Sequence, residues 1–203
     1  MNFRYKFSIV LVILGIISAI MSFGGTRTSE VLPEHILSAL VQGNSQISAD
    51  KLAEIIVEED SAYQIVDVRG KDQYKLHSLP GARSIPLSEI LNTENEAILK
   101  SNSIYTIFYS GDSEQASQAW ILSMQKGYDK ALFLKGGLAE WETTVMKSAF
   151  DKEKITAAEN KLFETRFKAR RLYMQWNAMP DSLKAGFFAQ KQIKDKELVG
   201  GCE

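Results

Sequence analysis

Short apolar runs alternate along the middle of the chain with longer stretches in which apolar residues recur every three or four positions. The runs are rich in β-branched and aromatic residues and are bounded by turn-forming residues, as buried strands require. The longer stretches have the period of amphipathic helices. We therefore expect strands at 46–47, 64–68, 82–85, 104–109 and 131–134.

Helices are expected between these strands. The clearest covers 49–59, where Ser48 is a suitable N-cap and the apolar face begins at Leu52. Further helices are predicted over 71–76, from 86–91 onward, over 114–126 and over 136–141. Strands separated by helices predict an α/β fold: a parallel sheet with helices on both faces and right-handed crossovers.

The N-terminus carries the longest apolar run. Arg4 and Lys6 precede the uncharged residues 7–23, and two glycines close the run. Its length is near the lower limit of a membrane-spanning helix and slightly beyond an ordinary signal-peptide core. A positive flank stays in the cytoplasm, so we expect a single-pass anchor with the rest of the chain on the extracytoplasmic (periplasmic) side of a bacterial cell membrane. Cleavage of the segment as a signal sequence, which would give a secreted protein, is the alternative.

These patterns divide the chain into four parts. Residues 1–25 are the anchor or signal sequence, 26–45 a linker with a short helix, 46–148 the α/β domain, and 149–203 a helical extension with a flexible tail.

The extension is basic and amphipathic. Its apolar residues keep an approximate seven-residue register, which predicts a helix over 150–177, a break at Met179-Pro180-Asp181, and a weaker helix over 182–194. Such a helix can pack on the domain, on a second copy of the chain or on a membrane surface, and the basic face does not choose among these.

Composition narrows the candidate chemistry. The formal net charge is −1, which is not that of a nucleic-acid-binding protein. The two histidines, His35 and His77, lie far apart, and the one cysteine is Cys202, so neither a metal site nor a cofactor is expected. Cys202 follows two glycines near the C-terminus, where it is a candidate for redox chemistry or for an intermolecular disulfide.

The stretch 104–126 combines a strand, a tight loop and a helix, one half of a βαβ unit. In such a unit the loop N–H groups and the helix N-terminus converge at the carboxyl end of the strand. The ligand-binding loop is therefore expected at Ser110, Gly111, Asp112, Ser113, Glu114 and Gln115.

The segment from Ile47 to Trp141 resembles a rhodanese-like domain. The resemblance rests on four features in order: Val66-Asp67-Val68-Arg69, Tyr74 through Leu79-Pro80-Gly81-Ala82 to Ile85-Pro86, the strand–loop–helix at 104–126, and Lys135-Gly136-Gly137 with Trp141. It implies a parallel five-stranded sheet flanked by helices. In catalytic members of this family the loop begins with a Cys that carries a persulfide, and usually contains a Gly and then an Arg.

The loop of this chain departs from that pattern. Counting back from Gly127-Tyr128, Ser110 stands at the Cys position, Ser113 at the Gly position and Gln115 at the Arg position. A serine hydroxyl is far less acidic than a thiol, has no route to a persulfide, and acts as a nucleophile only beside a general base. We therefore expect no catalytic residue in the loop.

The neighbouring polar residues are expected to be structural. His77 is the candidate base in the domain, but a structural role is favoured over a Ser–His pair. Asp67 and Arg69, at the end of a neighbouring strand, are expected to brace the loop. Asp112 and Glu114 place negative charge in the loop and disfavour a doubly charged anion such as thiosulfate.

Two functions remain open. The favoured one is a membrane-anchored, non-catalytic rhodanese-like module that binds or scaffolds an unidentified protein partner. Residues 7–23 would anchor it in the membrane. The alternative is a sulfurtransferase or thiol-redox protein that acts through Cys202. A dimer joined through Cys202 or through the helix at 151–177 is compatible with either function.

Overall fold

The computed structural model describes residues 12–13, 45–100, 103–149 and 156–188. In chain order the elements are β1 (Gln46–Ile47), α3 (Ala49–Glu58), β2 (Tyr63–Asp67), α4 (Lys71–Leu76), β3 (Ala82–Ser84), the 3₁₀ turn η1 (Leu87–Glu89), α5 (Thr93–Leu99), β4 (Tyr105–Tyr109), α6 (Ser113–Gln125), β5 (Ala131–Leu134), α7 (Gly137–Trp141), the π-turn η2 (Glu142–Met146) and α8 (Ala157–Ala178). A further helical segment covers 181–188.

The five strands form one parallel sheet in the order β1-β5-β4-β2-β3. The expected five-stranded parallel α/β fold is therefore confirmed. β4 lies at the centre, where Ile107 pairs with Ile65 and Phe108 with Val66 of β2. Because successive side chains of a strand point to opposite faces, the side chains of these two pairs lie in the hydrophobic core on opposite faces of the sheet.

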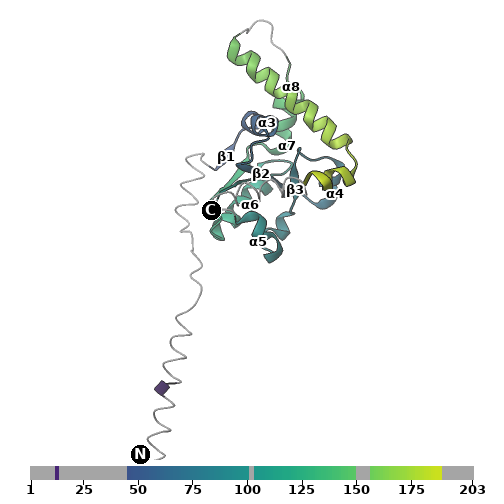
Figure 1. Ribbon diagram of the computed structural model, residues 1–203. Helices are drawn as coiled ribbons and strands as arrows, with labels where there is room; N and C mark the ends of the chain where they lie inside the picture. Colours follow the sequence, from purple (N-terminus) through teal and green to yellow (C-terminus); the bar gives the residue numbers. More distant parts are fainter. Residues whose placement is uncertain (1–11, 14–44, 101–102, 150–155, 189–203) are drawn as a thin grey trace, which may run out of the picture. The chain divides into compact units, whose positions relative to one another are not determined.

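The two faces of the sheet carry separate hydrophobic clusters. Ile65 and Ile107 pack with Leu52 of α3, Trp141 of α7 and Ala169 of α8. The opposite cluster combines strand residues with the apolar faces of α5 and α6, and includes Val66, Phe108, Leu99, Ala116 and Trp120. Figure 1 accordingly shows α3 and α8 on one side of the sheet and α5 and α6 on the other.

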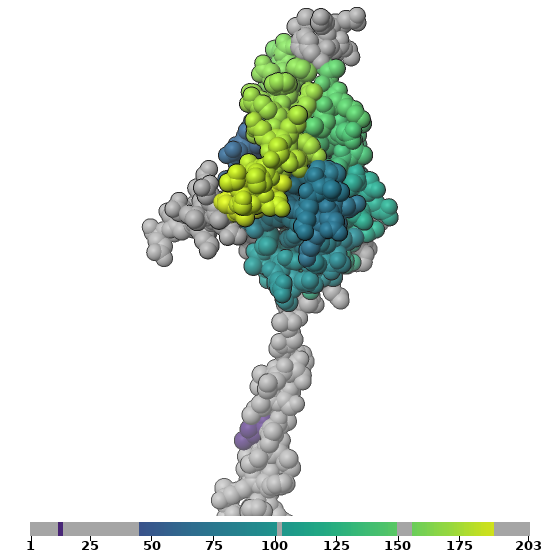
Figure 2. All heavy atoms as spheres, turned by 90° about the vertical axis from the view of Figure 1, so that its right-hand side faces the viewer, coloured from purple at the N-terminus to yellow at the C-terminus, as the bar shows by residue number. Residues whose placement is uncertain are grey.

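The basic helix α8 packs on the domain. Ala169 is fully buried, and the Arg166 guanidinium makes a two-bond ion pair with Asp50 of α3 at 2.6 and 2.8 Å. Figure 2 shows α8 and the 181–188 segment lying beside α4 on this face of the domain. Of the three surfaces left open by the sequence, the structure shows α8 on the domain, where Ala169 and Trp176 are buried. Packing of the helix on a second copy of the chain or on a membrane stays a prediction.

Two predicted elements need correction. The helix expected from 86–91 is the short 3₁₀ turn η1 instead, and the helix that follows is α5, which the apolar pattern did not indicate. The helix expected over 150–177 begins at Ala157, because Thr156 and Glu159 form a reciprocal capping box. The strand predicted at 64–68 lies one residue earlier, and the strands predicted at 82–85 and 104–109 are each one residue shorter.

Other expectations fall outside the described residues. These are the short helix of the 26–45 linker, the tail with Cys202, and the apolar run at 7–23 apart from Val12 and Ile13. Within the part of the chain that is described, none of the helices combines the length and the apolar character needed to cross a bilayer. The domain boundaries at 25, 45 and 148 stay predictions.

Candidate functional site

The candidate loop connects β4 to α6 at the carboxyl end of the sheet. Tyr109 ends β4, Ser110 follows it with no exposed surface, and α6 begins at Ser113. The loop residues Gly111 and Asp112, and Glu114 and Gln115 in the first turn of α6, are exposed. A loop therefore connects the strand and the helix where the sequence predicted one, whereas ligand binding by this loop stays a prediction.

The Ser110 hydroxyl is engaged inside its own loop. It donates a hydrogen bond of 2.6 Å to the main-chain oxygen of Asp112. A nucleophilic serine needs a general base to take its proton. The proton of Ser110 is directed at a carbonyl oxygen, which cannot act as that base.

The N-terminus of α6 is capped by the chain itself. The Asp112 carboxylate accepts the N–H of Glu114 at 2.8 Å. A free helix N-terminus attracts anions because its first N–H groups have no intrahelical partner and its dipole is positive there. The Asp112 carboxylate already supplies a negative charge and one acceptor, so this end of α6 is a poor site for a second anion.

The start of α7 closes over the loop from the other side. The N–H groups of Leu138 and Ala139 donate to the carbonyls of Ser110 and Gly111 at 2.9 and 3.1 Å. The N–H of Gly136 donates to the Ser113 hydroxyl at 2.7 Å. The loop is therefore fixed by backbone contacts to a second helix.

Gly137 makes this closure sterically feasible. A Cβ atom at this position would lie 2.6 Å from the main-chain oxygen of Asp112, and the φ angle is +57°. Both conditions require glycine. The glycine at position 137 is thus explained by the close approach of α7 to the loop.

Asp67 and Arg69 form a buried ion pair at the end of β2. Their closest atoms are 2.6 Å apart, and Asp67 has no exposed surface. Arg69 also donates to the main-chain oxygen of His77 at 2.7 Å and lies 5.7 Å from the centre of the Tyr109 ring. These contacts brace the turn after α4, beside the residue that precedes Ser110. Whether the pair also braces the 110–115 loop stays a prediction.

Tyr109 links this cluster to the same turn. Its hydroxyl accepts the N–H of Leu79 at 3.1 Å. Complete burial, reinforced by the nearby Asp67 charge, raises the pKa of Tyr109 well above its usual range. The phenol is therefore neutral and serves as a structural acceptor.

His77 lies against Arg69. Its Nε2 is 3.3 Å from an Arg69 guanidinium nitrogen, and because a guanidinium can only donate, this ring nitrogen is the acceptor. Partial burial, together with the Arg69 charge, lowers the pKa of His77. With the Ser110 proton donated to Asp112, the arrangement is not a Ser–His pair.

A contact that sequence reasoning missed joins α8 to this turn. Asn177 accepts the N–H of Ser78 at 2.8 Å and donates to its carbonyl at 3.0 Å, while the Trp176 indole donates to the Ser78 hydroxyl at 3.0 Å. The seven-residue register of apolar residues in the extension includes Trp176. It carried no signal for a partner 98 positions away.

Metal chemistry finds no support in the described ranges. They hold no group of three or more His, Cys, Asp or Glu residues arranged to bind a metal ion. Cys202, the redox candidate, lies outside them.

Comparison with known proteins assigns the fold. Residues 48–144 match the family model of the rhodanese-like domain. The adenylyltransferase and sulfurtransferase uba4 of Ogataea parapolymorpha is 30% identical over 99 residues, which cover 47% of this chain and 25% of that protein. The centrosomal protein of 41 kDa B of Xenopus laevis is 33% identical over 86 residues, which cover 39% of this chain and 24% of that protein. The chain thus spans about a quarter of the length of each of these relatives.

Partial similarity to solved structures is also found. The rhodanese-like domain of the Anabaena protein Alr3790 aligns with a TM-score of 0.44 at 24% identity, covering 56% of this chain and 92% of that one. The matched residues run from the N-cap of α3 into η2, and so include all of the sheet except β1. Residues 48–144 of this chain therefore match the rhodanese-like domain family.

Proposed function

We propose that this protein is a membrane-anchored rhodanese-like module that binds or scaffolds a protein partner and does not transfer sulfur. The observation that carries the proposal is the state of Ser110. It stands where catalytic members of the family have their persulfide-forming Cys, it is completely buried, and its proton is donated to the Asp112 carbonyl.

The chemistry of oxygen and sulfur supports this reading. A cysteine thiol has a pKa of about 8.5, which helix N-termini lower further, so a thiolate is accessible near neutral pH. A serine hydroxyl reaches no such state without a base, and the imidazole of His77 is engaged with Arg69. This loop therefore lacks an atom that can carry the transferred sulfur.

The electrostatics of the loop point the same way. A rhodanese-type substrate such as thiosulfate carries two negative charges. The N-cap and the first turn of α6 present the carboxylates of Asp112 and Glu114, and Gln115 stands where the family has Arg. Like charges about 4–6 Å apart disfavour binding by roughly one to a few kcal/mol at a partly buried site.

The names of the relatives are compatible with more than one use of the domain. One relative is named a sulfurtransferase and another a centrosomal protein. The fold therefore does not by itself imply sulfur transfer, and the function must be argued from the loop.

The proposed location rests on the N-terminal sequence. Arg4 and Lys6 before the uncharged residues 7–23 favour an uncleaved anchor with the domain on the extracytoplasmic side, while cleavage would release a secreted domain.

We expect the full chain to stay with membranes after carbonate extraction. A thiol reagent that does not cross the membrane should label Cys202 in intact cells. Labelling that requires lysis would place the domain in the cytoplasm and contradict the proposed orientation.

Sulfur transfer from thiosulfate to cyanide tests the catalytic half of the proposal. We expect the purified full chain to form thiocyanate at the rate of the protein-free blank. The Cys202→Ser variant is assayed beside the wild type, to test whether the tail thiol contributes to any activity. If wild-type activity existed and vanished in this variant, the tail thiol would carry the chemistry and the non-catalytic reading would fail.

A further inference from the structure

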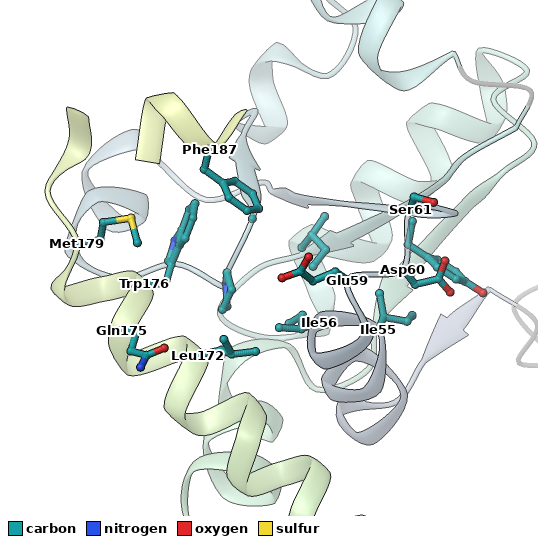
Figure 3. A pocket seen from close by; sticks show the side chains of 14 residues that line it. Ile55, Ile56, Glu59, Asp60, Ser61, Leu172, Gln175, Trp176, Met179 and Phe187 are labelled. Atoms are coloured by element: carbon teal, nitrogen blue, oxygen red, sulfur yellow. The ribbon is translucent and has the colours of Figure 1, made fainter. Parts of the chain in front are cut away.

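A pocket of about 410 Å³ lies between α3, the start of β2 and the C-terminal extension. Its walls come from the end of α3, the Pro80-Gly81 turn, the C-terminal part of α8 and Phe187 of the 181–188 segment (Figure 3). Ligand pockets in proteins commonly have volumes of about 300–1,000 Å³. The space is therefore sufficient for a small organic molecule.

The pocket is separate from the Ser110 loop. Tyr63 begins β2 and Pro80-Gly81 precede β3, so the pocket is at the amino edge of these parallel strands, whereas Ser110 follows the carboxyl end of β4. Part of its wall also lies outside the family match at 48–144, because Leu172, Trp176 and Phe187 belong to the extension. The pocket is thus a feature of this chain and not of the matched domain alone.

The aromatic wall is held in place. The Trp176 indole donates to Ser78, and its ring meets Phe187 edge-on with centroids 5.3 Å apart at 76°. Gly81 has φ +70°, and a Cβ there would come within 3.4 Å of the Phe187 ring. These contacts give the pocket a preformed aromatic side.

The charged residues that line the pocket are both acidic. Glu59 follows the last turn of α3 and Asp60 comes next, and the lining includes neither Lys nor Arg. Figure 3 shows the Glu59 carboxylate directed across the pocket toward the side formed by Trp176 and Phe187. Asp60 accepts the N–H of Ala62, whereas among the described residues no hydrogen bond or ion pair engages the Glu59 carboxylate.

Glu59 occupies an unusual backbone position. Its φ of 51° is left-handed, and at this helix-terminating position glycine is the usual residue. Among the described residues it is the one non-glycine with positive φ. A nearby cation, Lys184, lies 5.7 Å from the Trp176 ring but faces its own acidic neighbour, Asp181, at 3.9 Å.

We infer that this pocket binds an organic cation with an apolar body, such as a hydrophobic amine or a quaternary ammonium compound. The apolar and aromatic walls would take the body of the ligand, and the ring faces and the Glu59 and Asp60 carboxylates would favour its positive charge. The inference does not depend on the proposed function, because the pocket and the Ser110 loop share no residue.

Benzyltrimethylammonium is a suitable probe, with benzenesulfonate as the anionic counterpart of similar size. Each is titrated into the full chain in a nonionic detergent at low salt, and the indole N–H signal of Trp176, assigned with Trp176→Phe, is followed by NMR. We expect a saturable shift with the cation at low-millimolar concentration or below, the affinity expected of a ligand of this size. The sulfonate should produce no saturable shift.

Variants of adjacent glutamates separate a specific site from general acidity. Glu59→Gln removes the pocket charge, and Glu59→Gly removes it while suiting the left-handed backbone, so that a failure to fold cannot explain the result. Both should weaken cation binding about tenfold, whereas Glu58→Gln, at an exposed position outside the pocket lining, should change it less than about twofold. Three outcomes would overturn the inference: no saturable shift of Trp176 with the cation, equal binding of benzenesulfonate, or equal affinities of Glu59→Gln and Glu58→Gln.

Discussion

Replacing Arg69 by methionine should lower the free energy of unfolding by about 3–5 kcal/mol, because the change leaves a buried carboxylate without its partner. Asp67 has no exposed surface, and Arg69 supplies three hydrogen bonds to its two oxygens at 2.6–3.2 Å. Arg69 also holds the His77 carbonyl, so the turn after α4 loses a contact as well. Chemical denaturation followed by circular dichroism measures the loss.

Two comparisons identify the cause of this loss. Lys71→Met breaks an exposed ion pair with Glu89 close by, and should cost no more than about 1 kcal/mol. The double variant Asp67→Asn, Arg69→Met should be more stable than Arg69→Met alone, since no uncompensated charge remains buried. A cost for Arg69→Met as small as that for Lys71→Met would mean that Asp67 reaches solvent, and would contradict the buried cluster described above.

Replacing Trp176 by alanine should cost about 3–5 kcal/mol of unfolding free energy, the usual range for removing a large buried aromatic side chain. Trp176 is 5% exposed, donates to Ser78, and contacts the rings of Phe187 and Phe188. Its removal leaves a cavity and frees the Ser78 hydroxyl from its partner. The same denaturation experiment reports the effect.

Met174 provides the matched control on the same helix. It is 62% exposed, so Met174→Ala should change stability by less than about 0.5 kcal/mol. Trp176→Phe should fall between the two, because it keeps much of the apolar contact and loses the hydrogen bond. If Trp176→Ala were as mild as Met174→Ala, α8 would not be part of the folded domain in solution.

The sheet could be predicted from the sequence because its strands are short, apolar and separated by clear turn residues. The runs 104–109 and 131–134 match β4 and β5 to within a residue. α5 was missed because its apolar residues stand at its end, at Ile98 and Leu99, so no amphipathic stripe marks it. The start of α8 was misplaced although its capping box, Thr156 with Glu159, is visible in the sequence.

The loop between β4 and α6 was predicted in position but not in detail, and ligand binding by it stays a prediction. The sequence indicated a loop at Ser110 and negative charge at Asp112. That the carboxylate caps α6, and that the Ser110 proton goes to the Asp112 carbonyl, depend on backbone geometry that residue patterns do not contain. The contacts of Ser78 with Trp176 and Asn177 require α8 to be docked, and the pocket that contains Glu59 follows from the same docking.

The rate of thiocyanate formation from thiosulfate and cyanide, with the purified full chain at high concentration, tests the central claim most directly. The claim is that a loop with buried Ser110 in place of Cys cannot carry sulfur. The predicted result is a rate equal to the protein-free blank for the wild type, for Cys202→Ser and for Ser110→Ala. Thiocyanate formed above the blank by the wild type and by Cys202→Ser, but lost in Ser110→Ala, would show that the loop transfers sulfur and would contradict the account.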